Sequence, residues 1–207
     1  MQEKDRGRSD VTSFKDLKLI LQLAEIKPSD IFCDLGCGKG NLCRWASKRL
    51  KYSYGIEESK RRYKSAKANM KKFSVRNVTI LNHNFRLSQT LRKLRQCTIF
   101  YCTFDEDLGF FKKFQDIVKP KTRLITFYLP PYPIMANSFE DWFYLMVTPF
   151  SIAKNKTEWL KSVTKKGSFN ELVKDIKREF EDHEERILDL EESLDGINWI
   201  TKSMNSN

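Results

Sequence analysis

Three glycines and one carboxylate stand close together in the first quarter of the chain. The segment Ile31 to Gly40 reads as an apolar strand that runs into the loop Gly36-x-Gly38-x-Gly40, and Asp34 lies two residues before the first glycine. A strand, a glycine loop and a following helix form the usual ligand position of a parallel sheet, with backbone N–H groups facing a crevice. We therefore expect a small molecule to bind at this loop; the alternative is a tight strand-to-helix turn without a ligand.

The position of Asp34 indicates the charge of that ligand. The dinucleotide fingerprint is G-x-G-x-x-G, whereas this loop is G-x-G-x-G with an acid ahead of it. Beside a pyrophosphate the Asp34 carboxylate would repel the ligand, but it would attract a ligand that carries an ammonium and a sulfonium. S-adenosylmethionine has both groups, so it is the cofactor that the loop predicts.

A second acid, Glu57, ends the next apolar run. That run covers Tyr52 to Ile56, and Glu57 stands seventeen positions after Gly40. A carboxylate at the tip of the neighbouring strand can accept hydrogen bonds from both hydroxyls of a ribose. We predict this role for Glu57; the alternative is a solvated charge at a strand end.

Together, the loop and Glu57 resemble motif I and the following acidic position of the class I S-adenosylmethionine-dependent methyltransferases. The segment Asn77 to Phe85 resembles their third strand and its exit, where most members carry an Asp against the adenine amino group. Here that residue is Asn84, whose amide oxygen can also accept, and the Phe85 N–H can donate to the ring. The resemblance implies a doubly wound, Rossmann-like α/β fold with a seven-stranded sheet whose last strand is antiparallel.

More narrowly, the chain is similar to the small archaeal protein-lysine methyltransferases, relatives of the histone-lysine methyltransferases that have the class I fold. The similarity covers about residues 11–150, and it includes Val11-Thr12 and the Val118 to Pro120 lead into a strand at Leu124. Lys39 stands where many relatives have an acid. The cofactor-binding residues that the resemblance implies are Thr12, Asp34, Gly36, Cys37, Gly38, Gly40, Asn41, Glu57, Asn84 and Phe85.

The acceptor residues follow from the chemistry of methyl transfer. Transfer from a sulfonium is an in-line displacement, so the enzyme holds the acceptor behind the methyl group and excludes water. A lysine acceptor must also lose its proton, and a desolvated aromatic channel disfavours its charged form. We predict such a channel from Phe104, after the fourth strand, and from Tyr128 and Tyr132, after the fifth; the alternative for each is packing.

One motif near this channel points elsewhere. Leu129 to Tyr132 resembles the N/D-P-P-Y motif of amino-methyltransferases that act on nucleic acid bases and glutamine. Here it follows the fifth predicted strand instead of the fourth, and Leu129 replaces the polar first residue. We therefore do not expect an adenine or glutamine methyltransferase.

The elements that position these residues follow from periodicity and punctuation. An amphipathic helix is predicted over 13–25. Strands and helices then alternate, which is the pattern of a parallel sheet. The strands lie near 31–35, 52–56, 77–81, 97–104 and 122–129, and the helices near 41–50, 59–73, 87–95 and 107–118. The segments 142–150 and 157–163 are predicted as a hairpin at the sheet edge.

Composition agrees with one enzyme-sized domain, which we predict over residues 1–167. A chain of 207 residues with 40% apolar residues can bury a substantial core. Five cysteines fit a reducing compartment better than a disulfide framework, and with only two histidines we expect no metal site. The charged first thirty residues do not read as a signal peptide, and no apolar run approaches membrane-spanning length. We expect a cytoplasmic protein without membrane contact.

Positive charge is concentrated in this predicted domain. The chain has 38 Lys and Arg against 27 Asp and Glu, and the segment 59–73 is especially basic. Such a surface attracts RNA, DNA or an acidic protein; the alternative is a solvated face that raises solubility. A protein substrate associated with nucleic acid fits this charge as well as an RNA substrate does.

Residues 168–207 are predicted as a separate amphipathic, coiled-coil-like helix. Ser168 and Glu171 form a capping box, and apolar positions from Val173 to Ile197 alternate at spacings of three and four, with His183 within the seam. This pattern predicts a helix through which the chain forms a homo-oligomer. The alternative is a helix that folds back on the basic domain.

The sequence thus predicts a methyltransferase that transfers a methyl group from S-adenosylmethionine to the ε-amine of lysine in proteins. An RNA methyltransferase is the first alternative. The second is an inactive methyltransferase-fold scaffold with a coiled-coil tail, which Lys39 and Asn84 permit. The intact glycine loop, Asp34 and Glu57 argue against it.

Overall fold

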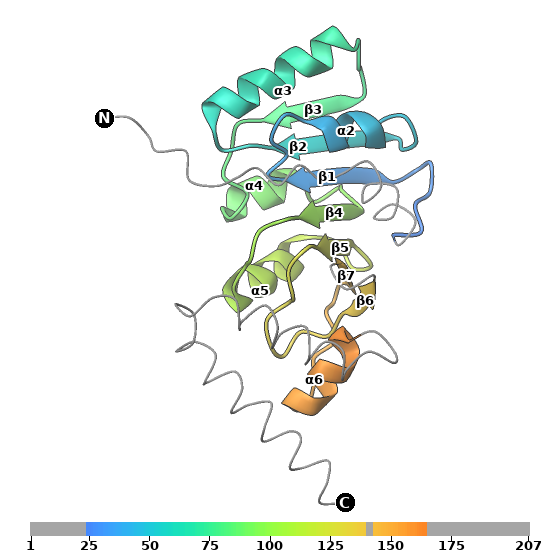
Figure 1. Cartoon of the computed structure of the whole chain (residues 1–207), viewed down its shortest axis with the longest axis vertical. Coiled ribbons are helices and arrows are strands. Elements are labelled where there is room, and N and C mark those ends of the chain that lie inside the picture. The colour runs from blue at the N-terminus through green and yellow to red at the C-terminus, as the bar shows by residue number, and fades with distance from the viewer. Residues whose placement is uncertain (1–23, 140–142, 165–207) are drawn as a thin grey trace, which may run out of the picture.

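One seven-stranded sheet forms the centre of the molecule. The computed structural model describes residues 24–139 and 143–164. The strand order is β3-β2-β1-β4-β5-β7-β6; the four pairs among β1 to β5 are parallel, and β7 runs antiparallel to both β5 and β6 (Figure 1). The strands are β1 (Ile31–Leu35), β2 (Tyr52–Ile56), β3 (Val78–Leu81), β4 (Ile99–Cys102), β5 (Arg123–Thr126), β6 (Asn137–Phe139) and β7 (Phe143–Val147). The predicted α/β fold is confirmed.

Four helices connect the parallel strands, as the alternation predicts: α2 (Asn41–Ala46), α3 (Lys60–Lys72), α4 (Ser88–Lys93) and α5 (Leu108–Ile117). A further helix, α6 (Lys156–Val163), follows β7. Side-chain caps fix the start of three of these helices, because Ser59, Asp107 and Asn155 each accept a hydrogen bond from the backbone N–H three residues later. Figure 1 places α3 at one end of the sheet and α6 at the other.

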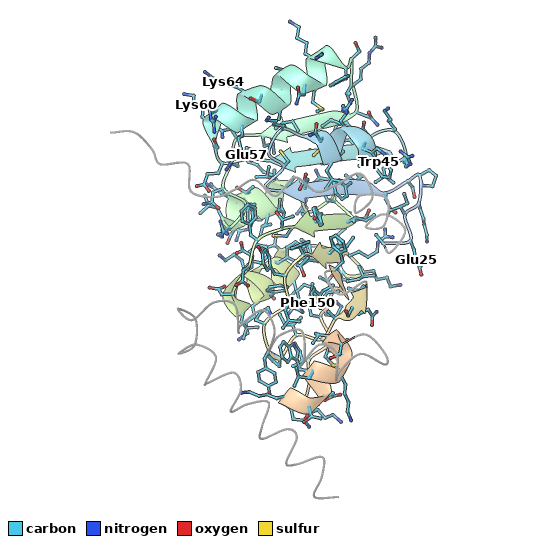
Figure 2. All side chains as sticks on the ribbon, in the orientation of Figure 1. Glu25, Trp45, Glu57, Lys60, Lys64 and Phe150 are labelled. Atoms are coloured by element: carbon cyan, nitrogen blue, oxygen red, sulfur yellow. The ribbon has the colours of Figure 1, made fainter. Side chains whose placement is uncertain are left out.

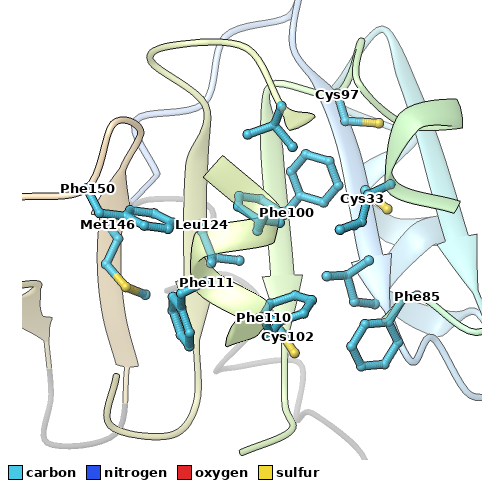
Figure 3. Close-up of a cluster of buried hydrophobic side chains, with 14 of the residues drawn as sticks. Cys33, Phe85, Cys97, Phe100, Cys102, Phe110, Phe111, Leu124, Met146 and Phe150 are labelled. Carbon is cyan, nitrogen blue, oxygen red and sulfur yellow. The ribbon is translucent and has the colours of Figure 1, made fainter. Parts of the chain in front are cut away.

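Side chains alternate between two apolar layers, one on each face of the sheet. Along β4, Phe100 and Cys102 point into a core formed with α4 and α5, which Figure 3 shows in close-up. Ile99 and Tyr101 point to the other face, where the core includes Leu42 of α2. Since both faces are covered, the central strands are apolar along their whole length.

A buried ion pair joins three strands at the end of the sheet where β1 begins. Asp30 Oδ1 accepts from the Thr98 hydroxyl at 2.8 Å and from Arg123 Nη2 at 2.5 Å, and its Oδ2 accepts from the Lys27 N–H at 2.7 Å. Burial raises the pKa of Asp30, but these hydrogen bonds and the Arg123 charge outweigh it, so the pKa lies below its usual value. The carboxylate therefore stays ionised and ties the starts of β1, β4 and β5 together.

The predicted hairpin is wrong in its second half. Its first half contains β7, but 157–163 belongs to α6, and the antiparallel partner of β7 is β6, which precedes it. Asn155 and Glu158 explain the helix: Asn155 Oδ1 accepts from the Glu158 N–H at 2.9 Å, and Glu158 Oε2 accepts from the Lys154 N–H at 2.6 Å. This reciprocal cap is a helix start signal that the sequence carries.

Two other predictions extend beyond the part of the chain that the structure describes. Of the helix predicted over 13–25, only Ala24 and Glu25 are described, and they lie in a turn instead of a helix. The predicted coiled-coil helix of 168–207 lies outside the described residues.

Candidate functional site

The candidate site lies where the carboxyl ends of β1, β2 and β4 meet. Leu35 of β1 pairs with Ile56 of β2 on one side and with Cys102 of β4 on the other, so the three strands end level with one another. The chain leaves β1 towards β2, whereas β4 starts the other half of the sheet, so the strand order reverses between β1 and β4. Such a reversal is the usual ligand position of an open parallel sheet.

The glycine loop follows β1 with an unusual backbone. Gly36, Gly38 and Gly40 have φ angles of 91°, 54° and 75°, all in the region that favours glycine. The N–H groups of Gly36 and Cys37 both donate to the Ile56 carbonyl at 2.8 Å, and the Gly38 N–H donates to Glu57 Oε2 at 2.9 Å. The expectation that the loop N–H groups face an open crevice is therefore wrong for these three, because β2 and Glu57 accept from them.

Glu57 is buried and connects the loop to α3 (Figure 2). Besides the Gly38 N–H, its carboxylate accepts from the Ser59 N–H at 2.8 Å and from Arg62 Nε at 3.1 Å, both through Oε1. Two carboxylate oxygens have about four acceptor positions, so a hydroxyl donor can still be accepted. The sequence did not reveal Arg62, in the first turn of α3, as the ionic partner, because the pair is five residues apart and Glu57 precedes the helix.

Asp34 is the second buried carboxyl group of this end of the sheet. Burial, and then the negative charge of Glu57, raise the pKa of Asp34 to about 7. The Cys43 thiol lies 4.0 Å from Asp34 Oδ2. Two neighbouring buried acids favour a cationic ligand, because a positive charge would stabilise both carboxylates.

Asn84 and Phe85 follow β3, as predicted, and have different surroundings. Asn84 Oδ1 accepts from the Arg86 N–H at 2.8 Å, and its Nδ2 donates to Glu58 Oε1 at 3.1 Å. This turn fixes the side-chain amide at the strand exit. The Phe85 ring is buried in the core of α4 and α5.

Arg86 and Glu106 form an ion pair beside these rings that the sequence did not reveal. Arg86 Nε lies 3.1 Å from Glu106 Oε2, and Arg86 Nη2 lies 2.5 Å from Oε1. The guanidinium also lies over the Phe85 ring at 4.7 Å and the Phe104 ring at 5.6 Å. Burial raises the pKa of Glu106, and Arg86 partly offsets this. The pair joins the exits of β3 and β4.

The three predicted channel residues are partly exposed aromatic side chains, and each packs against a different part of the fold. Phe104 lies against the glycine loop, since a Cβ added at Gly36 would come within 2.2 Å of its ring, and it packs on Phe85 at 5.5 Å. Tyr128 packs edge-on against Phe127 at 5.5 Å. Tyr132 packs edge-on against Trp159 of α6 at 6.2 Å. Phe104 is thus the predicted channel residue that directly contacts the loop.

The remaining predicted residues divide into three groups. Cys37 is buried among Cys43, Ala66 and other side chains between α2 and α3, whereas Asn41 is exposed at the start of α2. Thr12 lies outside the described residues. Within 24–139 and 143–164, no group of three or more His, Cys, Asp or Glu side chains could hold a metal ion, and no helix is long and apolar enough to cross a membrane.

A family comparison identifies the fold. The model of the family described as "Histone methylation protein DOT1" matches residues 11–165, which include every described strand and helix. The chain belongs to this family. Membership in the DOT1 family confirms the predicted class I S-adenosylmethionine-dependent methyltransferase fold and agrees with S-adenosylmethionine as the cofactor.

The individual relatives either match a short part of this chain or match it at low sequence identity. A probable cobalt-precorrin-6B C(15)-methyltransferase of Methanococcus maripaludis is 38% identical over 55 residues, which are 27% of this chain and 30% of that protein. The match thus spans less than a third of this curated relative. An RNA methyltransferase of Salinibacter ruber, solved with S-adenosyl-L-homocysteine, superposes with a TM-score of 0.57 and 19% identity, over 70% of this chain and 97% of that one.

A second solved structure has the same fold. The precorrin-6y C5,15-methyltransferase of Geobacter metallireducens superposes with a TM-score of 0.51 and 15% identity, over 59% of this chain and 66% of that one. At these identities the superpositions establish the fold alone.

Proposed function

We propose that this chain binds S-adenosylmethionine at the β1, β2 and β4 exits and transfers its methyl group to lysine in proteins. The observation that carries the proposal is the match of residues 11–165 to a histone methylation family. It extends over the whole described sheet, so the glycine loop, Glu57 and the acceptor side all belong to it. The resemblance to archaeal protein-lysine methyltransferases supports the same acceptor.

The residues of the site fit this cofactor, which supplies a methyl group on a cationic sulfur. Asp34 and Glu57 offer buried negative charge to a ligand with ammonium and sulfonium groups. Glu57 keeps acceptor capacity for ribose hydroxyls, and the amide of Asn84 is held at the β3 exit for an adenine amino group. Each of these side chains would thus accept a hydrogen bond from the cofactor or stabilise one of its cationic groups.

On the acceptor side, the chain provides aromatic walls. Phe104 covers Gly36, and Tyr128 follows the neighbouring strand β5. Aromatic rings lower the polarity around an approaching lysine, which disfavours its ammonium form and leaves the amine free to react. We propose Phe104, Tyr128 and Tyr132 for this role.

RNA methylation is the second candidate, and the basic surface of α3 favours it. Seven of the thirteen residues of α3 are Lys or Arg and none is acidic. Phosphate groups would be attracted to this helix. The fold alone is compatible with either acceptor.

Labelled cofactor distinguishes the two acceptors. A cell extract is incubated with the purified chain and methyl-labelled S-adenosylmethionine, then treated with protease or ribonuclease. We expect the label to survive ribonuclease, to be released by protease, and to elute as methyllysine after acid hydrolysis. Label found only in RNA would overturn the lysine acceptor and support the second candidate.

Matched variants tie the label to the site. We expect Glu57→Gln to lose most of the label, because removing a charged acceptor costs about 1 to 3 kcal/mol of binding. Asp116→Asn also removes one carboxylate charge, from an exposed residue near the end of α5, and should label like the unchanged protein. Calorimetry with S-adenosylhomocysteine shows whether a loss of label is a loss of binding.

A further inference from the structure

The exposed side of α3 carries a straight line of four lysines. Spacings of four, three and four residues place them within about 60° of one another around the helix axis, over a length of about 16 Å. Another side of the helix is fixed in the fold, since Ala66 and Met70 pack against Ile80 of β3. The four residues, named the lysine stripe below, are Lys60, Lys64, Lys67 and Lys71, and each is exposed.

The positive charge of the lysine stripe is not compensated within the described fold. The sequence of α3 is KRRYKSAKANMKK, so no acidic residue stands one turn from any stripe lysine within the helix. One ion pair of α3 joins Arg62 to Glu57, on the side of the candidate site. In the part of the chain that the structure describes, no carboxylate pairs with a stripe lysine. Like charges one turn apart repel, and a bound polyanion would relieve that repulsion.

We propose that the lysine stripe is a docking surface for the phosphate backbone of a nucleic acid. One strand of a duplex carries a phosphate about every 3.4 Å, so the stripe faces about five phosphates. The stripe lysines follow one another at about 4.5 to 6 Å along the helix axis, so each can lie beside a different phosphate of one strand. A lipid surface fits less well, because the apolar side of α3 packs on the sheet and is not available for insertion.

The basic surface continues beyond the C-terminal end of α3. Phe73 is 47% exposed, with the Arg44 guanidinium 3.9 Å and Lys72 Nζ 5.6 Å from its ring centroid. At the other end, Lys60 lies near Glu57 (Figure 2). A strand bound along the stripe would therefore end beside the candidate site. It would hold a nucleic-acid-associated protein near the enzyme without being methylated itself, so the proposal is independent of the acceptor.

The salt dependence of binding tests this surface. Fluorescence anisotropy of the full chain is measured with a labelled 20-base-pair DNA duplex and a labelled 20-nucleotide RNA, from 50 to 200 mM NaCl. Four duplex contacts contribute about 3.6 to the slope of log K against log salt, and four single-strand contacts about 2.8. Changing all four stripe lysines to Gln should reduce the slope by about these amounts and weaken binding at 50 mM NaCl at least tenfold.

A matched variant controls for net charge. It changes four exposed lysines elsewhere to Gln, namely Lys112, Lys119, Lys154 and Lys161. This control should reduce the slope by less than half as much. An equal loss of slope and affinity in both variants would overturn the proposal, because it would show that only net charge matters. Wild-type affinity and slope in the stripe variant would overturn it as well. Binding of phosphatidylserine vesicles but of neither nucleic acid would also overturn it. Unchanged calorimetric affinity for S-adenosylhomocysteine shows that the stripe variant is folded and that its site is intact.

Discussion

At the scale of single residues, Asp34 links the charge of the site to pH. Its pKa of about 7 means that the carboxyl group of the unliganded protein is largely neutral at pH 5.5 and largely ionised at pH 7.5. The affinity for S-adenosylmethionine should therefore rise by about tenfold over this range, which stays below the amino-group pKa of about 7.7 to 8.0. Asp34→Asn should bind weakly and with little pH dependence. Calorimetry at several pH values checks this, and a flat wild-type profile would contradict it.

The same carboxyl group has an opposite effect on folding. A folded-state pKa above the usual value of 3.8 stabilises the protein below about pH 4, and this stabilisation is lost as the pH rises through about 7. Asp34→Asn removes that titration, so its free energy of unfolding relative to wild type should increase by roughly 2 to 4 kcal/mol from pH 4 to pH 8. Urea denaturation at both pH values measures the difference.

Alanine substitutions at Gly36 and Gly38 distinguish the cost of backbone strain from the cost of a steric clash. Both have positive φ, so alanine at either position should cost about 1 to 2 kcal/mol of stability. At Gly36 a Cβ would also come 2.2 Å from the Phe104 ring, whereas at Gly38 nothing lies within 4 Å. Gly36→Ala should therefore be the more destabilising change in urea denaturation.

A double-mutant cycle tests the cause of that difference. Phe104→Ala should remove the added cost of Gly36→Ala and leave the cost of Gly38→Ala unchanged. Additive effects at Gly36 and Phe104 would show that the ring does not occupy the space over the loop.

At the scale of elements, one end of the parallel strands contributes to stability and the other carries the candidate site. The ion pair of Asp30 and Arg123 joins the starts of β1 and β5, while the candidate site lies at the ends of β1, β2 and β4. Arg123→Met leaves the buried Asp30 carboxylate without its cation, and we expect a loss of about 3 kcal/mol of stability. Cofactor affinity below the unfolding temperature should not change. Thermal unfolding and calorimetry separate the two effects, and a parallel loss of affinity would contradict this division.

The positions of the strands were easier to predict from the sequence than the hydrogen bonds and ion pairs of the site. Apolar runs between charged turns located all five parallel strands, because buried parallel strands are apolar on both faces. The helix at Lys156–Val163 was predicted as a strand, although Asn155, directly before it, is a residue type that commonly caps a helix N-terminus. The hydrogen bonds from the loop to Ile56, the ion pair of Arg86 with Glu106 and the pKa of Asp34 depend on register and burial. Local sequence does not specify those quantities.

At the scale of the whole molecule, the division into residues 1–167 and 168–207 stays a prediction. If the seam from Val173 to Ile197 joins two chains, truncation after Gly167 should lower the mass measured by light scattering. Affinity for S-adenosylhomocysteine should stay nearly unchanged, because the described residues proposed to bind the cofactor lie between Asp34 and Phe85. An unchanged mass would contradict self-association through this segment.

The short outer strands of the sheet have a consequence for handling the protein at high concentration. An unpaired strand edge is a template for another chain, and long flat edges invite aggregation. Here the two outer strands are β3, with four residues, and β6, with three. Each offers a foreign strand few backbone groups to pair with. The sheet is therefore protected against edge-to-edge assembly by the brevity of its borders.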